Sequence, residues 1–353
     1  MAVKNKQIRI GIIGAGGIFR SRHFPGLAKI ADAEVTAICN RSVASGRKIA
    51  QEFKLDPDIM TDPHALIARK DIDAVMIGTW PYMHMPFVLD SLDAGKHTWV
   101  QARMAMNLRE AKAMYARAEE TGLATQICQP PHALGGDYYM RHLISTGYVG
   151  DITNVIVRSM NGSLLNPKTP LHWRQIGRYS GLNTMAVGML VEFVHRWCGY
   201  TASVTAQAET FVKQRPAGRG KMGDVERPDT VNVLSTLENG ATAVYLFSGA
   251  AHCAPNEQIE IYGTKGTLVY HTNVDLRKQK IYGAKSNAAK LAEIKIPKRH
   301  QREWTIEQDF IDAIRTGENA ESTFYQGVKY MEFTEAVFRS VEQGATVRLP
   351  IVD

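Results

Sequence analysis

The residues with the clearest chemical meaning are glycines near the amino terminus. An apolar run at residues 8–13 leads directly into Gly14-Ala15-Gly16-Gly17-Ile18, and a segment that can be helical follows. A dinucleotide diphosphate binds backbone amides at the start of a helix, and side chains at Gly14 and Gly16 would block its approach. The pattern predicts a dinucleotide-binding turn at Gly14, Gly16, Gly17 and Ile18. A tight turn with a purely structural role is the alternative.

A second apolar strand, at residues 34–39, ends at Asn40-Arg41-Ser42. Sites specific for NAD normally place an acidic residue here, on the ribose hydroxyls, and this chain has none. Asn40 and Ser42 can hydrogen-bond a hydroxyl or a phosphate, and Arg41 can bind a 2′-phosphate with its charged fork. We therefore expect NADP rather than NAD. NAD stays open, because Asn40 can serve it and Arg41 can be a solvated surface residue.

Two kinds of sheet are expected to position these residues. Apolar strands alternate with helical patterns in the first part of the chain, which is typical of a doubly wound parallel sheet. These strands are expected at residues 8–13, 34–39, 74–78, 97–101 and 124–128. Longer alternating runs follow Pro130-Pro131, and they indicate a mainly antiparallel sheet. These runs are residues 152–163, 202–213, 230–249 and 258–271.

The whole chain has the composition of a globular protein with two domains. It has 353 residues, 44% of them hydrophobic, and a formal net charge of +7. No apolar run has membrane-spanning length and the first residues lack an apolar signal core, so we expect a cytoplasmic protein. The positive residues are scattered, which argues against nucleic acid and fits an anionic small molecule. We expect no metal centre and four buried free thiols, at Cys39, Cys128, Cys198 and Cys253.

The carboxyl-terminal part carries two amphipathic helical patterns, at residues 304–316 and 325–344. Both are expected to pack against the sheets. Helices on only one face of an antiparallel sheet leave the other face uncovered, which predicts a homo-oligomer through that open face.

By these motifs the chain resembles the glucose-fructose oxidoreductase, inositol dehydrogenase and rhizopine-catabolism (Gfo/Idh/MocA) family over essentially its full length. The motifs are the Gly14–Ile18 turn, Thr79-Trp80-Pro81-Tyr82-Met83-His84 in place of Thr-Pro-Asn-x-x-His, Ala94-Gly95-Lys96-His97, residues 261–266 and residues 310–314. The resemblance implies an α/β Rossmann domain at residues 1–128 and an α+β substrate-binding and oligomerisation domain with a large open sheet at residues 129–353. It also implies nicotinamide redox chemistry on sugars, cyclitols or related polyols, with Thr79, Trp80, His84 and Gln101 at the cofactor.

The usual catalytic residues of that family are missing here. Its Glu-Lys-Pro motif is replaced by Gln101-Ala102-Arg103, so an alanine stands where the family has its lysine. Three polar positions of a later helix become Ala186, Leu190 and Phe193. Removing a hydroxyl proton requires a positioned base, which none of these side chains can be. The family mechanism therefore cannot be inherited unchanged.

Residues just before the altered helix are the candidates to replace them. His172 titrates near neutral pH, and Tyr179 can act if Arg174 or Arg178 lowers its pKa. The alternative is that both are structural hydrogen-bonding residues, and His132 is a weaker third candidate. Glu192 lies one residue off the expected helix face, and we interpret it as the partner of a nearby cation.

Several cations point to a negatively charged substrate. Arg103 follows the fourth strand of the expected parallel sheet at its carboxyl end, where ligands bind in such sheets, and a guanidinium there suits a carboxylate, phosphate or sulfonate. Lys168, Arg174 and Arg178 can converge on the same ligand, and Asn183 is expected to contact it. The alternatives are surface charges without a ligand, and a contact between Arg103 and the cofactor.

Three functions are compatible with this pattern. The first is an NAD(P)-dependent oxidoreductase acting on a sugar, cyclitol or glycoside, with His172 or Tyr179 as acid and base. The second is a glycosidase or lyase that oxidises a ring carbon transiently and returns the hydride to its product. The third is a ligand sensor that kept the fold and lost the chemistry, which the alanine and leucine replacements favour.

Overall fold

The computed structural model describes residues 7–128, 134–255, 257–273 and 275–352. The chain divides into two compact units. The first consists of Met1–Gln129 and Trp304–Val328, and the second of Pro130–Glu303 and Lys329–Asp353. We expected all residues after 128 to belong to the second domain. In the structure, Trp304–Val328 belong to the first unit.

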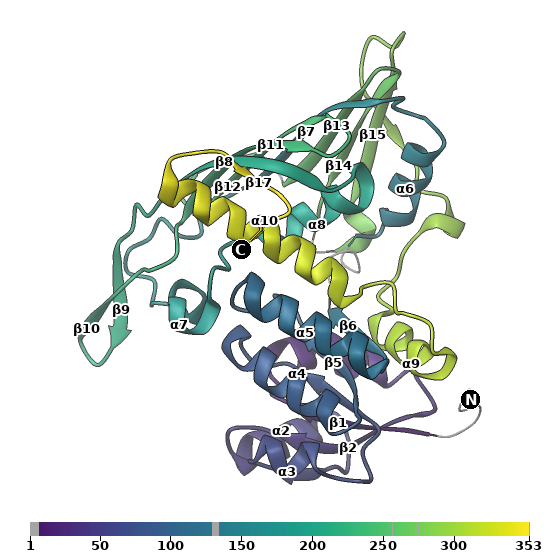
Figure 1. The fold of residues 1–353 in the computed structure, drawn as a ribbon, viewed down its shortest axis with the longest axis vertical. Helices are drawn as coiled ribbons and strands as arrows, with labels where there is room; N and C mark the ends of the chain where they lie inside the picture. The colour runs from purple at the N-terminus through teal and green to yellow at the C-terminus, as the bar shows by residue number, and fades with distance from the viewer. Residues whose placement is uncertain (1–6, 129–133, 256, 274, 353) are drawn as a thin grey trace. The chain divides into compact units, whose positions relative to one another are not determined.

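The first unit is built on a parallel sheet with the strand order β3-β2-β1-β4-β5-β6 (Figure 1). The strands are β1 (Ile8–Ile13), β2 (Ala33–Cys39), β3 (Asp58–Met60), β4 (Ala74–Ile77), β5 (His97–Gln101) and β6 (Thr125–Cys128). This is the order of a doubly wound dinucleotide-binding fold, with its crevice where the order reverses, between β1 and β4. The expected parallel sheet is confirmed, and the structure adds the short edge strand β3.

Helices connect these strands. They are η1 (Phe19–His23), α1 (Phe24–Leu27), α2 (Val43–Glu52), α3 (Pro63–Ile67), η2 (Pro81–Met83), α4 (His84–Asp93), α5 (Leu108–Thr121) and α9 (Ile306–Thr316). Helix α4 packs against α3 and α5, while α1 packs against α9. Helix α5 begins at Asn107, whose Oδ1 accepts the backbone N–H of Glu110 at 2.9 Å, and it ends at the left-handed Gly122. This is the capping pattern expected of such a sequence.

Helix α9 belongs to the core of the first unit. Its side chains Ile306, Phe310 and Ile311 are fully buried in a cluster that also contains Phe24 and Trp99. Burying an apolar side chain of this size contributes about 1.5–3 kcal/mol. The apolar face of α9 therefore joins the parallel sheet, although 177 residues separate the end of β6 at Cys128 from the start of α9 at Ile306.

The second unit contains a nine-stranded sheet with the order β16-β15-β14-β13-β7-β12-β11-β8-β17 (Figure 1). The strands are β7 (Ile152–Met160), β8 (Thr201–Glu209), β11 (Thr230–Leu237), β12 (Thr242–Ser248), β13 (Gln258–Gly263), β14 (Gly266–His271), β15 (Lys280–Lys285), β16 (Ala292–Ile294) and β17 (Val347–Arg348). A separate hairpin is formed by β9 (Gln214–Gly218) and β10 (Lys221–Asp224). Among the described strands of the large sheet only β7 and β12 run parallel, which confirms the mainly antiparallel expectation.

One face of this large sheet is covered by helices. The helical segments of this unit are α6 (Asp137–Ser145), η4 (Trp173–Gln175), α7 (Gly177–Ser180), α8 (Val187–Cys198), η5 (Leu276–Lys278), η6 (Lys298–His300) and α10 (Phe324–Gln343), of which α10 belongs to it from Lys329 on. Helix α8 packs on β7, and Phe333 of α10 packs on Tyr245 of β12 with ring centroids 5.1 Å apart. On the opposite face, paired positions on neighbouring strands bring Leu234, Val244 and Ile156 into one row, and Leu234 is 60% exposed.

All four cysteines are free thiols. Cys39, Cys128 and Cys198 are buried as expected, but Cys253 is exposed. The expectation was wrong for Cys253 because its short apolar neighbourhood lies in the connection after β12 and not in a strand. Within the described residues, no helix combines the length and apolar character that crossing a membrane requires.

Candidate functional site

The glycine turn after β1 has the geometry of a diphosphate seat. Gly14 has a φ of +81° and donates its N–H to the carbonyl of Cys39 at 2.9 Å. A Cβ at Gly14 would lie 2.8 Å from Cγ2 of Thr79, so only glycine fits there. A Cβ at Gly16 would meet only the Gly14 carbonyl at 3.8 Å, and one at Gly17 would meet nothing within 4 Å. The space beside Gly16 and Gly17 is open, which fits a bound dinucleotide.

Phe19 follows this turn at a position where dinucleotide-binding motifs usually carry a small residue. Its ring is fully buried and packs edge-on against Phe24 and Trp99, with centroids 5.7 and 5.9 Å apart. Room for the ring comes from Gly78 at the end of β4, where a Cβ would lie 2.7 Å from Cδ2 of Phe19. The large residue in the motif is therefore accommodated by a small one on a neighbouring strand.

At the end of β2 the three predicted ribose-binding residues have different surroundings. Asn40 donates from Nδ2 to the carbonyl of Ala15 at 3.3 Å, which links β2 to the glycine turn. The side chain of Ser42 accepts the N–H of Ser45 at 3.3 Å and thereby caps α2. Arg41 is exposed and makes no ion pair within the described part of the chain. Of the three, Arg41 is the side chain that can reach a ligand without breaking a contact.

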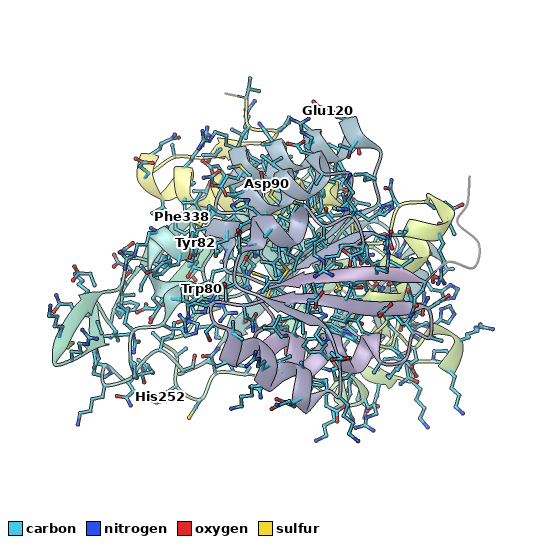
Figure 2. All side chains as sticks on the ribbon, turned by 90° about the horizontal axis from the view of Figure 1, so that it is seen from below. Trp80, Tyr82, Asp90, Glu120, His252 and Phe338 are labelled. Atoms are coloured by element: carbon cyan, nitrogen blue, oxygen red, sulfur yellow. The ribbon has the colours of Figure 1, made fainter. Side chains whose placement is uncertain are left out.

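His84 connects the loops after β4 and β5. It is fully buried, with Nδ1 3.0 Å from the carbonyl of Arg103 and Nε2 3.0 Å from that of Thr79. Burial lowers the pKa of His84, while the hydrogen bonds to these backbone carbonyls oppose the shift. Because both ring nitrogens lie against backbone carbonyls, we assign His84 a positioning role for these two loops. Trp80 and Tyr82 are partly exposed on the first of them (Figure 2).

Gln101, at the end of β5, is tied into a buried polar chain. Its Oε1 lies 3.0 Å from Nε2 of His23, and Nδ1 of the same histidine lies 2.5 Å from Oε1 of Glu307. Trp304 donates its indole N–H to Glu307 at 3.0 Å. These contacts fix the strand end that carries Ala102 and the half-buried Arg103. Contacts of Gln101 and Arg103 with a cofactor or a substrate stay predictions.

In the second unit a pocket of about 380 Å³ lies beside the altered helix. It is lined by Ser159, Asn161, Ser163, Leu164, His172, Arg174, Gln175, Thr184, Met185, Ala186, Arg227, Pro228, Ser248, Gly249 and Glu257. Two of the predicted site residues, His172 and Arg174, are on this wall. Ala186 is also on it, whereas Leu190 and Phe193 are buried in the packing of α8.

His172 is both a helix cap and a pocket residue. Its Nδ1 accepts the backbone N–H of Arg174 at 3.3 Å, and its own backbone N–H donates to Oε1 of Gln175 at 3.1 Å. Burial and the nearby Arg174 lower the pKa of His172. In the neutral ring Nδ1 is therefore the acceptor, and Nε2 carries the proton.

The other predicted residues of this unit lie elsewhere. Tyr179 and Arg178 are outside the pocket lining, with the guanidinium of Arg178 stacked 4.7 Å from the tyrosine ring centre. Asn183 is buried and donates from Nδ2 to the carbonyl of Ser180 at 2.6 Å, so it holds the turn before α8. His132 lies outside the described residues.

The prediction that Glu192 is the partner of a nearby cation is confirmed. It is buried, and Nη2 of Arg196 donates to its Oε1 at 3.3 Å. Arg196 also approaches Asp137, which accepts from Arg302 at 3.1 Å and from the indole of Trp197 at 2.8 Å. Burial raises the pKa of Glu192 to about 7, although Arg196 opposes this shift.

Two charged pocket residues were not predicted. Arg227 lies in the connection between β10 and β11, and Glu257 immediately precedes β13. The carboxylate of Glu257 accepts the hydroxyls of Ser159 and Thr272, the latter at 2.7 Å. Neither residue belongs to a motif, and each is more than 50 residues from His172 in the sequence. Only the pairing of the strands brings them to one wall.

The strand order and the open glycine turn define the first unit as a Rossmann domain that binds a dinucleotide. Comparison with known protein families also identifies a Rossmann domain in this part of the chain. Residues 8–128 match the model of the oxidoreductase family with an NAD-binding Rossmann fold, and residues 138–269 match the GFO/IDH/MocA C-terminal domain. The chain belongs to the GFO/IDH/MocA family of nicotinamide-dependent oxidoreductases.

Individual relatives are distant in sequence. An uncharacterized oxidoreductase of Synechocystis is 23% identical over 269 residues, 75% of this chain and 72% of the relative. The dTDP-3,4-didehydro-2,6-dideoxy-alpha-D-glucose 3-reductase of Actinomadura kijaniata is 25% identical over 342 residues, 88% of this chain and 95% of the relative. The 2,7-anhydro-N-acetylneuraminate hydratase of Mediterraneibacter gnavus is 25% identical over 231 residues, 64% of this chain and 57% of the relative.

A solved structure of levoglucosan dehydrogenase, in complex with NADH and levoglucosan, has the same fold. Its TM-score is 0.88 at 20% identity, and the match covers 98% of this chain and 100% of that chain.

Proposed function

We propose that the chain oxidises or reduces one carbon of a sugar, cyclitol or glycoside, with NADP or NAD as the redox partner. The nucleotide, when bound, supplies or accepts the hydride. The observation that carries this proposal is the pocket of the second unit, which combines charged and apolar side chains, in a chain whose glycine turn is open to a dinucleotide. A volume of about 380 Å³ is near the small end of ligand pockets and suits a single sugar ring. The names of the Actinomadura reductase and of levoglucosan dehydrogenase support a carbohydrate substrate.

Within this proposal His172 exchanges the proton. Its ring lies on the pocket wall, and its Nδ1 accepts the Arg174 amide, so Nε2 carries the proton and can donate it to a substrate carbonyl oxygen as that carbonyl is reduced. Tyr179 is the less favoured candidate because it does not line the pocket. Arg103 and Arg174 are proposed to favour an anionic substrate.

Arg41 supports a preference for NADP. Its exposed guanidinium follows β2, at the position where the 2′-phosphate of NADP would lie, and no carboxylate replaces it there. The open face of the large sheet, with its row of Leu234, Val244 and Ile156, is proposed as the contact between copies of the chain.

Transient oxidation with return of the hydride is the second candidate. It is favoured by the relative named as a hydratase, whose match covers 64% of this chain. A ligand sensor is the third candidate, because Ala102, Ala186 and Leu190 stand where the family usually has its acid and base groups.

One experiment separates these three. The purified full-length protein is first analysed by mass spectrometry for bound nucleotide, and then incubated with neutral and anionic sugars and glycosides. Absorbance of reduced nicotinamide and released product are followed together. Both signals rising together mean net redox turnover, product without a change in absorbance means transient oxidation, and neither signal means a sensor. A Gly16→Val variant serves as the control, because a side chain there fills the open seat and should abolish nucleotide binding.

A further inference from the structure

The pocket of the second unit contains two arginines whose positive charges are not neutralised by ion pairs with carboxylates of the described residues. Arg174 and Arg227 both line it, and neither forms an ion pair with a carboxylate among the described residues. Arg227 is half-buried, and its Nε is enclosed by the protein, whereas Arg174 is exposed and its guanidinium lies 4.5 Å from the ring centre of Trp173. A guanidinium removed from water without a counter-ion costs free energy. Such a group is expected to be retained for a ligand.

Two buried arginines elsewhere in the chain have acceptors for their terminal guanidinium nitrogens. Arg302 is paired with Asp137, and Arg215 donates to the carbonyls of Asn166 and Leu164. Burial lowers the pKa of Arg227, and the charge of the neighbouring Glu226 opposes this shift. The Oε2 of Glu226 accepts the backbone N–H of Gly177 at 2.6 Å, and its carboxylate makes no ion pair with Arg227 in the described residues. Arg227 therefore has charge available for a molecule in the pocket.

Hydrogen-bond donors on the same wall also lack acceptors. The Nε of Arg227 and the Nε2 of Gln175 are both buried and have no hydrogen-bond partner within the described part of the chain. Buried donors are nearly always satisfied, and leaving one unsatisfied costs about 1–3 kcal/mol. A ligand that offers several acceptor oxygens would satisfy both.

The pocket wall also carries a negatively charged hydrogen-bond acceptor. Glu257 is the carboxylate on the wall, and the hydroxyls of Ser159 and Thr272 already donate to it. Its negative charge repels an anion, while its remaining lone pairs can accept a sugar hydroxyl. An anionic ligand should therefore place its charged group at the arginines and its hydroxyl groups toward Glu257.

We propose that Arg174 and Arg227 form an oxyanion-binding subsite that selects sugar derivatives carrying a carboxylate or a phosphate. The planar fork of arginine matches either group with paired charge-assisted hydrogen bonds. This inference rests on the proposed function in one respect, namely that the pocket receives the substrate. Within this subsite Arg227 is proposed as the residue that determines specificity.

The test measures binding by isothermal titration calorimetry on the full-length protein, with matched ligands. D-glucose is compared with D-glucuronate and D-glucose 6-phosphate, D-galactose with D-galacturonate and D-galactose 6-phosphate, and myo-inositol with myo-inositol 1-phosphate. The variants are Arg227→Gln and Arg174→Gln, with Arg299→Gln as a control at an exposed arginine outside the pocket. The carboxylate and phosphate arms show which oxyanion is preferred.

In at least one set the charged ligand should bind about tenfold or more tightly than its neutral parent, as expected for hydrogen bonds to a charged group. Arg227→Gln and Arg174→Gln should each remove most of this preference, because the affinity for the charged ligand falls much more than that for its neutral parent. The control variant Arg299→Gln should keep the preference. The melting temperature of ligand-free Arg227→Gln should not fall, because the change removes an unpaired charge. Equal affinity for charged and neutral ligands in every set would overturn the proposal, and so would equal losses for both ligands in Arg227→Gln.

Nucleotide binding is measured on the same samples, so the two proposals can fail separately. Nicotinamide turnover without any preference for anions would refute the oxyanion subsite alone. An Arg227-dependent preference without nucleotide binding or turnover would leave the subsite intact and refute the redox proposal.

Discussion

The ring of Phe19 occupies the space that a side chain at Gly78 would need. The two residues are far apart in the sequence, and a Cβ at Gly78 would also lie 2.8 Å from the carbonyl oxygen of Gly14. Gly78 thus keeps both the buried ring and the nucleotide turn in place. A bulky residue in the glycine motif is tolerated because the compensating glycine is on a neighbouring strand.

Gly78→Ala should destabilise the protein. The added methyl group must displace the Phe19 ring or the Gly14 carbonyl, and overpacking of this kind costs about 1–3 kcal/mol. Urea unfolding, followed by tryptophan fluorescence, would measure the loss in the free energy of unfolding. Gly17→Ala is the control, because a Cβ there meets nothing within 4 Å, and its stability should equal that of the wild type. Equal stabilities of Gly78→Ala and wild type would contradict the proposed packing.

Arg41→Ser should change the choice between the two nucleotides. Removing the guanidinium takes away a charge-assisted contact with a 2′-phosphate, so affinity for NADPH should fall about tenfold or more. Affinity for NADH should stay within about twofold, since NADH lacks that phosphate. Fluorescence titration of both reduced nucleotides would measure this. A parallel loss for both would show that Arg41 supports the fold or the ribose and does not select NADP.

Glu192→Gln should alter how stability depends on pH. The pKa of Glu192 is raised by burial from 4.5 to about 7, so between these values the folded state holds a proton that the unfolded state has released. The contribution of Glu192 to the free energy of unfolding of the wild type therefore falls as the pH rises from 4.5 to 7. This fall is up to about 3 kcal/mol in total. Glutamine does not ionise, so the variant should gain stability relative to wild type from pH 4.5 to 7.

Urea unfolding at several pH values would measure the difference between the two proteins. The exposed Glu238→Gln variant is the control for loss of a carboxyl group. A difference that stays constant over the whole window would show that Glu192 does not retain its proton, and that Arg196 holds it as a carboxylate.

Leu234→Glu should weaken assembly of the chain through the open sheet face. Leu234 is 60% exposed and pairs across the strands with Val244, so a carboxylate there would be desolvated in an interface between copies. Size-exclusion chromatography with light scattering should show a smaller particle. Met222→Glu, on the separate β9-β10 hairpin and 55% exposed, is the matched control. An unchanged mass for Leu234→Glu would exclude this face as the contact.

The sequence alone determined the scaffold. Strand periodicity and the Gly14–Gly17 turn are local patterns, because backbone geometry and alternate burial are set by neighbouring residues. They were sufficient to predict the parallel sheet and the mainly antiparallel sheet. The resemblance to the family implied the loss of its usual acid and base groups, and the position of Glu192 one residue off the expected helix face led to the expectation that it pairs with a cation.

The tertiary structure decided which charged groups share a pocket. His172 and Arg174 line the pocket, but Arg178, Tyr179 and Asn183 do not, because the short helices before α8 turn these side chains to other neighbours. Arg227 and Glu257 reach the same wall through the pairing of strands far apart in the sequence. Helix α9 and Gly78 likewise acquire their roles only through long-range packing. No local pattern records such contacts, since they depend on which distant surfaces exclude water together.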